Sequence, residues 1–271
     1  MDLPVAVGVD TSAASLAAAH WAAEEAALRD RPLRVLHALP LMPHLLPSGT
    51  ARSPFEGSAL LHAVRHVLAV RHPQLRTRTD EVHDVATAAL VAASEDAELL
   101  VLAVRGDGGF PGLRVGSTAL HVAARAACPT VLVPAEEADA GLRDRIVVAV
   151  DARRPHGAAL DFAFDTARRH GLPLRILHAF PATGVPGWDG RAREADLLAA
   201  ALGPWRDSHP EVEVTEVAEP AGPGLLLVEA SAKARLLVLG RRPAASPGRI
   251  GPVAHAVLHH AVCPVALVPG T

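Results

Sequence analysis

Residues 105–118, RGDGGFPGLRVGST, place several glycines directly before a segment with the apolar spacing of a helix. The unsatisfied N–H groups and the positive end of the dipole at a helix start favour a bound phosphate. Gly106 and Gly116 let the backbone approach phosphate oxygens, and Ser117 and Thr118 add hydroxyl donors. A plain strand-to-helix connection in which Ser117 or Thr118 caps the helix has the same composition. The stretch alone therefore indicates either a phosphate site or a connecting loop.

The histidines and the single lysine are weaker indications of chemistry. His62 with His66, and His255 with His259, have the i, i+4 spacing that places two metal ligands on one helix face. No HExxH motif, cysteine pair or neighbouring carboxylate in the sequence completes such a site, so we expect no metal. Lys233 is not part of a GxxxxGK[ST] motif, which argues against a P-loop.

Composition narrows the classes of function. The 271 residues are 50% hydrophobic, carry a formal net charge of −3 and include five Phe, three Trp and no Tyr. Near neutrality and scarce aromatic side chains argue against nucleic-acid partners. No apolar run reaches the length of a membrane span and the first residues lack a secretory signal, so we expect a cytoplasmic protein without membrane partners. Cys128 and Cys263 give little disulfide framework, as expected in a reducing compartment.

The elements that must position the glycine-rich stretch occur twice. RPLRVLHALP (31–40) and LPLRILHAFP (172–181) match at seven of ten positions, 141 residues apart. CPTVLVP (128–134) and CPVALVP (263–269) match at five of seven, 135 residues apart. A duplication that lost six residues from the second copy explains both offsets.

Each copy alternates apolar, strand-like runs with Ala-rich, helix-like segments. In the first copy, strands are expected to end at Asp10 and to lie near 33–39, 75–83, 98–104 and 129–134, with helices near 15–30, 59–72, 85–95 and 118–127. Such alternation is typical of a parallel sheet covered on both faces. The sequence therefore predicts an α/β protein of two tandem doubly wound domains, residues 1–137 and 143–271, each a five-stranded, mainly parallel sheet with helices on both faces.

Polar residues of the first copy follow strands that share one edge of this sheet. Asp10 ends the first strand, His37 and Ala38 end the second, and the glycine-rich stretch follows the fourth. Open parallel sheets bind ligands beyond the carboxyl ends of their strands. A cap of the next helix is an alternative role for Asp10, and a structural hydrogen bond is the expected role of His37 and its counterpart His178.

In these ordered motifs the chain resembles the universal stress protein family, over nearly its whole length and as two tandem copies. The first strand of the family ends in G-V-D, here residues 8–10, and the second carries V-x-H, here 35–37. GGFPGL at 108–113 and the CP pair before the last strand also fit. The resemblance implies a stress-response protein.

Nucleotide-binding members of this family carry G-2x-G-9x-G-[ST] after strand four. Gly106, Gly116 and Ser117 fit the motif, whereas Ala103 stands in place of the first glycine. The resemblance implies that the first copy binds ATP or another adenine nucleotide, with or without Mg²⁺. The residues that the resemblance assigns to this ligand are Val9, Asp10, Ala38, Leu102, Ala103, Arg105, Gly106, Gly116, Ser117 and Thr118.

The second copy departs from the motif. Gly240 holds the first glycine position, but Pro243 replaces the second glycine, and only seven residues separate it from Gly251. Pro252 replaces the serine, and proline offers neither an N–H nor a hydroxyl, although it fits the first turn of a helix. We expect the second copy to bind ATP poorly or not at all and to be mainly structural.

Three functions remain open. The resemblance favours a stress-response protein that binds ATP in its N-terminal domain as a regulatory ligand and is not an enzyme beyond slow ATP hydrolysis. An interaction module that binds no nucleotide and an adenylate-cleaving enzyme are the alternatives; the S-G-G-x-D-S type of signature expected of the latter is missing. The resemblance also implies that the two last strands pair within the chain as a pseudo-dimer, with another face open to a homodimer.

Overall fold

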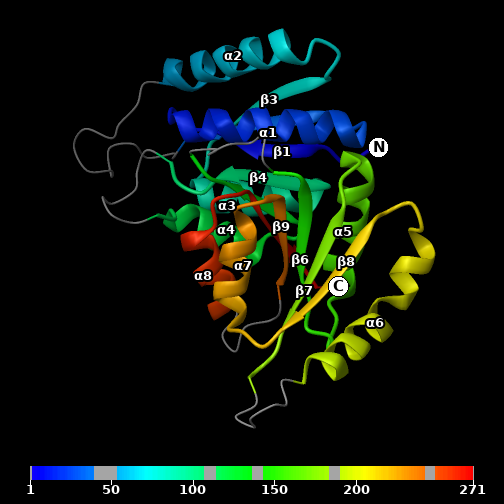
Figure 1. Cartoon of the computed structure of the whole chain (residues 1–271). Coiled ribbons are helices and arrows are strands. Elements are labelled where there is room, and N and C mark those ends of the chain that lie inside the picture. Colours follow the sequence, from blue (N-terminus) through cyan, green and yellow to red (C-terminus); the bar gives the residue numbers. More distant parts are fainter. Residues whose placement is uncertain are drawn as a thin grey trace. The chain divides into compact units, whose positions relative to one another are not determined.

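The computed structural model of the chain describes residues 2–39, 54–106, 114–135, 143–182, 190–241 and 248–270. The chain divides into two compact units, Met1–Ala135 and Glu136–Thr271, which share one order of strands and helices (Figure 1). The middle of the glycine-rich stretch lies outside the described residues, as does Pro243 of the second copy.

The first unit alternates strands and helices along the chain. Its strands are β1 (Val5–Gly8), β2 (Leu33–Ala38), β3 (Thr77–Val82), β4 (Leu99–Ala103) and β5 (Thr130–Val133). Its α-helices are α1 (Ala13–Arg29), α2 (Pro54–Arg71), α3 (Ala86–Ala93) and α4 (Ser117–Arg125). Nearly every residue of β1, β4 and β5 is buried, as expected for strands covered on both faces.

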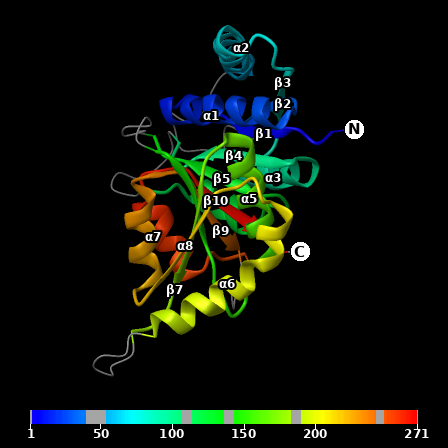
Figure 2. The ribbon, with the colours of Figure 1, turned by 45° about the vertical axis from the view of Figure 1, so that its right-hand side comes forward.

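The strands of the first unit pair in parallel in the order β3-β2-β1-β4-β5. Helices α1 and α2 contact each other on one side of this sheet, and α3 and α4 contact each other on the opposite side (Figures 1 and 2). The chain runs outward from β1 to β3 and then returns to β4 on the other side of β1. The strand order therefore reverses between β1 and β4, which is where doubly wound folds bind ligands.

Helix α1 shows how local sequence defines an element. It begins after Ser12, whose hydroxyl accepts a hydrogen bond from the N–H of Ser15 at 3.0 Å. Six of its nine alanines are buried. Near its end, Arg29 forms an ion pair with Glu25 at 2.8 Å, and Arg29 also reaches Glu98 at 3.1 Å. Arg29 and Glu25 are only 5% and 1% exposed, so the charges are compensated inside the unit.

The second unit repeats the same plan. Its strands are β6 (Arg145–Ala149), β7 (Leu174–Ala179), β8 (Val214–Glu219), β9 (Ala234–Arg241) and β10 (Val265–Pro269). Its helices are α5 (Gly157–His170), α6 (Arg191–Ser208), α7 (Pro223–Ser231) and α8 (Pro252–His260). The strands pair in parallel in the order β8-β7-β6-β9-β10.

The register of the strands fixes which residues of the two copies are equivalent. Ala103 lies opposite Val133 in the first unit, and Gly240 lies opposite Val268 in the second. Val133 and Val268 hold the same place in the repeated segment of the last strand. Ala103 and Gly240 are therefore equivalent positions, as the sequence comparison expected.

The predicted α/β fold, with two tandem domains of mainly parallel strands and helices on both faces, is confirmed. Most ends differ by a residue or two: the helix predicted over 118–127 spans Ser117–Arg125. The helix predicted near 59–72 begins five residues earlier, at Pro54. Pro252 is the first residue of α8, which confirms its expected place in the first turn. The domain limits 1–137 and 143–271, the pseudo-dimer and the homodimer stay predictions.

Candidate functional site

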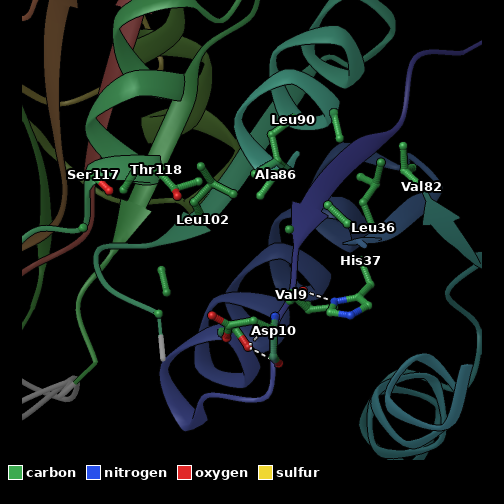
Figure 3. Close-up of a pocket in the computed structure, with 18 of the residues that line it drawn as sticks. Val9, Asp10, Leu36, His37, Val82, Ala86, Leu90, Leu102, Ser117 and Thr118 are labelled. Atoms are coloured by element: carbon green, nitrogen blue, oxygen red, sulfur yellow. Dashed lines mark hydrogen bonds between the residues drawn. The ribbon is translucent and has the colours of Figure 1, made fainter. Parts of the chain in front are cut away.

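A cavity of about 230 Å³ lies at the carboxyl edge of the first sheet, where the strand order reverses (Figure 3). Nine of the ten residues that the resemblance assigned to a ligand line this cavity, from Val9 after β1 to Thr118 in α4. Arg105 is not among the lining residues. Residues that are more than one hundred positions apart in sequence therefore surround one hollow.

The carboxylate of Asp10 is fixed beside the backbone of Gly106. Its Oδ1 accepts hydrogen bonds from the backbone N–H of Ser12, at 2.9 Å, and from the Ser12 hydroxyl. Its Oδ2 lies 2.1 Å from the point that a Cβ at position 106 would occupy, so a larger residue at 106 would displace the carboxylate. Because Ser12 caps α1, Asp10 supports the cap without being the cap itself. Asp151 likewise accepts from the N–H two residues on, at 3.1 Å.

His37 and His178 are buried at equivalent strand ends. The Nδ1 of His37 donates to the carbonyl oxygen of Val9 at 2.8 Å. In His178 the Nδ1 lies 3.1 Å from the carbonyl oxygen of Val150, and the Nε2 lies 3.1 Å from the carboxylate of Glu194. The expected structural hydrogen bond is thus confirmed in both copies. His37 also lines the cavity, where its bond fixes the segment that leads from β1 to Asp10 (Figure 3).

Helix α4 begins at the cavity with Gly116 as its N-cap, in an extended conformation with φ −73° and ψ 148°. Among the described residues no side chain caps this helix, and its N-cap is Gly116, so the alternative that Ser117 or Thr118 is an ordinary N-cap is wrong. Both residues lie in the first turn, whose N–H groups have no intrahelical acceptor. Both line the cavity, and neither hydroxyl has a hydrogen-bond partner within the described residues. These donors suit an anion.

Strand β3 and helix α3 supply an apolar wall that sequence reasoning missed. Val82, Ala86 and Leu90 line the cavity together with Leu102 (Figure 3). The segment 86–93, ATAALVAA, contains no charged residue, which indicates a helix without a strongly solvated face. No motif links it to the glycine-rich stretch, so its residues are recognisable as apolar but not as lining residues.

Neither a metal site nor a membrane span is found within the described residues. No group of three or more His, Cys, Asp or Glu side chains there is arranged to hold a metal ion. His62 and His66 are exposed on α2, while the rings of His255 and His259 lie 4.5 Å apart on α8. None of the described helices is long and apolar enough to cross a membrane.

Known proteins resemble this chain in sequence and in fold. The model of the universal stress protein family matches it twice, over residues 3–134 and 143–269. Universal stress protein Rv2623 of Mycobacterium tuberculosis is 31% identical over 261 residues, which cover 89% of this chain and 86% of that protein. Universal stress protein Mb2028c of Mycobacterium bovis is 32% identical over 282 residues, covering 96% and 95%. A universal stress protein structure from Archaeoglobus fulgidus, 17% identical, matches 99% of both chains with a TM-score of 0.74, which shows the shared fold.

Proposed function

Because the chain belongs to the universal stress protein family as two tandem domains, we propose that its N-terminal domain binds ATP or another adenine nucleotide as a regulatory ligand. The start of α4 is the observation that carries this proposal. There the hydroxyls of Ser117 and Thr118 and the first-turn N–H groups border a cavity that also contains Asp10. These donors match the phosphates of a nucleotide.

The opposite wall of the cavity suits the base. Val82, Ala86 and Leu90 offer apolar surface to a planar ring, and the Asp10 carboxylate offers acceptors to an exocyclic amine. Ligand sites usually combine such apolar walls with a few polar groups that fix orientation. Mg²⁺, when present, is expected to be held mainly by the phosphates of the nucleotide.

A regulatory role agrees better with the lining residues than catalysis does. Asp10 and His37 are the titratable side chains among the described lining residues. Asp10 accepts from Ser12 and His37 donates to Val9, so both are engaged in bonds that hold the backbone. We therefore propose a stress-response protein whose nucleotide is sensed, with hydrolysis slow at most.

Two further parts of the proposal concern the whole chain. Both copies of the family unit are present, and we propose that the two domains pair within one chain. Sedimentation measures the mass of the particle and so distinguishes a single 28.2 kDa chain from a homodimer. Cys128 and Cys263 are both buried and unbridged, which supports a reducing compartment such as the cytoplasm.

Nucleotide release and titration test the proposal. The purified chain is denatured, the released small molecules are identified, and ATP is titrated against wild type, Gly116→Val and Gly251→Val. Both glycines are extended N-caps; a Cβ at Gly116 meets its nearest atom at an ordinary 3.5 Å, and a Cβ at Gly251 meets nothing within 4 Å. We expect one nucleotide per chain, affinity reduced at least about tenfold by Gly116→Val, and no change for Gly251→Val.

Other outcomes favour the alternatives. Absence of binding at millimolar ATP would leave the interaction module as the function. Rapid, metal-dependent turnover would favour the adenylate-cleaving enzyme. Equal losses in the two glycine variants, or two nucleotides per chain, would place a nucleotide in the C-terminal domain and contradict the assignment to one domain.

A further inference from the structure

The C-terminal domain has its own cavity, of about 310 Å³, at the carboxyl ends of β6, β7 and β9. Asp151 and Ala179 line it at the positions that Asp10 and Ala38 hold in the N-terminal domain. The rest of the wall is mostly aliphatic and comes from α7, β9 and α8, including Leu226, Leu227, Leu239 and Val253.

Three of the donors that suit an anion in the N-terminal domain are missing at the start of α8. Pro252 stands at the position of Ser117 and contributes neither an N–H nor a hydroxyl. Val253 stands at the position of Thr118 and replaces its hydroxyl with a methyl group. The carboxylate of Asp151 is nevertheless retained. The first-turn N–H groups of Val253 and Ala254 remain. An anion in this cavity would nevertheless meet the charge of Asp151 without the two hydroxyls and the N–H of Ser117 that the N-terminal domain supplies, so we expect the cavity to disfavour phosphates and carboxylates.

His156 introduces a ring N–H at the place where the N-terminal domain has the Ser15 hydroxyl, which already donates to backbone carbonyl oxygens. It stands at the position of Ser15, and its ring lines the cavity. Its Nδ1 accepts a hydrogen bond from the N–H of Ala159 at 3.2 Å and thereby caps α5. The proton of the neutral ring is therefore on Nε2. Nε2 is buried and has no hydrogen-bond partner within the described residues, an arrangement that is costly and rare.

Two glycines leave room for this ring. A Cβ at Gly240 would lie 2.5, 2.6 and 2.8 Å from Cγ, Cδ2 and Cβ of His156, so the ring occupies the space that a side chain would need. A Cβ at Gly270 would lie 3.5 Å from Nε2. Gly240 corresponds to the first glycine of the family motif, but its contact with His156 explains it without a nucleotide.

We propose that this cavity binds a small uncharged molecule with an apolar body and one hydrogen-bond acceptor, such as a carbonyl oxygen, which accepts the Nε2 proton of His156. Leu226, Leu227 and Leu239 are among the residues that contact the apolar body. The chain then carries two sites of different chemistry, one for an anionic nucleotide and one for a neutral molecule. This site is independent of nucleotide binding in the N-terminal domain.

Acetophenone and benzoate test the proposal, because both carry a phenyl ring and an acceptor but only benzoate is charged. Each is titrated into the ¹⁵N-labelled full chain while the amide signals of Ala179 and Gly240 are followed. We expect saturable shifts with acetophenone and at least about tenfold weaker binding of benzoate. Failure of acetophenone to shift these signals, equal binding of benzoate, or ATP binding at α8 would overturn the proposal.

Three variants locate the acceptor and the cavity. His156→Phe keeps an aromatic ring and removes the donor. It is expected to weaken the binding of acetophenone about three- to tenfold, and to leave unchanged the binding of ethylbenzene, which has no acceptor. His260→Phe is the matched control on an exposed histidine of α8 and leaves both affinities unchanged. Ala254→Leu fills the cavity and should abolish the binding of acetophenone and of ethylbenzene. This variant keeps His156, so it tests the site independently of any effect of His156→Phe on folding. Persistence of binding in Ala254→Leu would contradict the assigned site.

Discussion

Replacing Gly240 with alanine tests whether His156 determines the residue at this position. The added Cβ would lie 2.5–2.8 Å from three atoms of His156, whereas ordinary contacts are about 3.5–4.0 Å. The imidazole must therefore move by about 1 Å, which also breaks its bond to the N–H of Ala159. Overpacking of this kind costs about 1–3 kcal/mol, and loss of an N-cap costs about 1 kcal/mol. We expect Gly240→Ala to lower the free energy of unfolding of the C-terminal domain by about 2–4 kcal/mol.

The same substitution is expected to be harmless once the ring is removed. His156→Ser together with Gly240→Ala recreates the Ser15 and Ala103 combination of the N-terminal domain, and serine is itself a favoured N-cap. In the His156→Ser background Gly240→Ala meets no ring and also reduces the freedom of the unfolded chain, so its effect should lie within about 1 kcal/mol of zero. The double-mutant cycle therefore predicts a coupling free energy of about 2–4 kcal/mol between positions 156 and 240.

Urea unfolding of the full-length variants measures these free energies, and hydrogen exchange at amides of α5 and β9 isolates the C-terminal domain. Ala103→Gly is the matched control in the N-terminal domain. It removes a methyl group where no histidine is present, so we expect a cost of about 0.5–1 kcal/mol from backbone entropy alone. The reasoning is refuted when Gly240→Ala costs the same with histidine and with serine at position 156.

Three further predictions concern buried polar groups. Arg153 lowers the pKa of the Glu194 carboxyl below its ordinary value of 4.5. Glu194 therefore stabilises the fold above that pH and loses this effect as the pH falls through the folded pKa. The urea midpoint of Glu194→Gln should lie below that of the wild type at pH 7, and the two midpoints should converge in acid. Burial raises the pKa of Cys263 to about 12, so iodoacetamide at pH 8 should label it only after unfolding. Arg29→Met should cost about 3–5 kcal/mol in urea unfolding, because the Glu25 carboxylate loses its buried arginine; a change below about 1 kcal/mol would contradict this.

The architecture was predictable because its determinants are local and repeated. Continuous apolar runs such as 99–103 specify strands that are buried on both faces, and the duplicated segments specify that the plan occurs twice. The start of α4 was not decided by sequence, since Gly116 and Ser117 are both acceptable N-cap types. The backbone settles it, because Gly116 takes the extended conformation of a cap and leaves Ser117 inside the first turn.

Contacts between distant segments account for most of what the sequence did not reveal. Asp10 and Gly106 are almost one hundred residues apart, and no sequence motif predicts that a carboxylate oxygen of Asp10 lies beside Gly106. His156 and Gly240 are a second such pair. Aligning Gly240 with the family motif was correct, yet the alignment carried no information on the side chain that fills the space beside it.

The pairs Asp10–Gly106 and His156–Gly240 show that a glycine of the family motif is not by itself support for nucleotide binding. In each domain a glycine of the family motif faces a side chain of the protein itself, Gly106 facing Asp10 and Gly240 facing His156. A glycine in this loop is therefore explained by internal packing before any ligand is considered. What differs between the domains is the supply of donors, because Ser117 opens α4 whereas a proline opens α8. Nucleotide binding should follow these donors, so exchanging the first two residues of α4 and α8 should weaken ATP binding more than Ala103→Gly alters it.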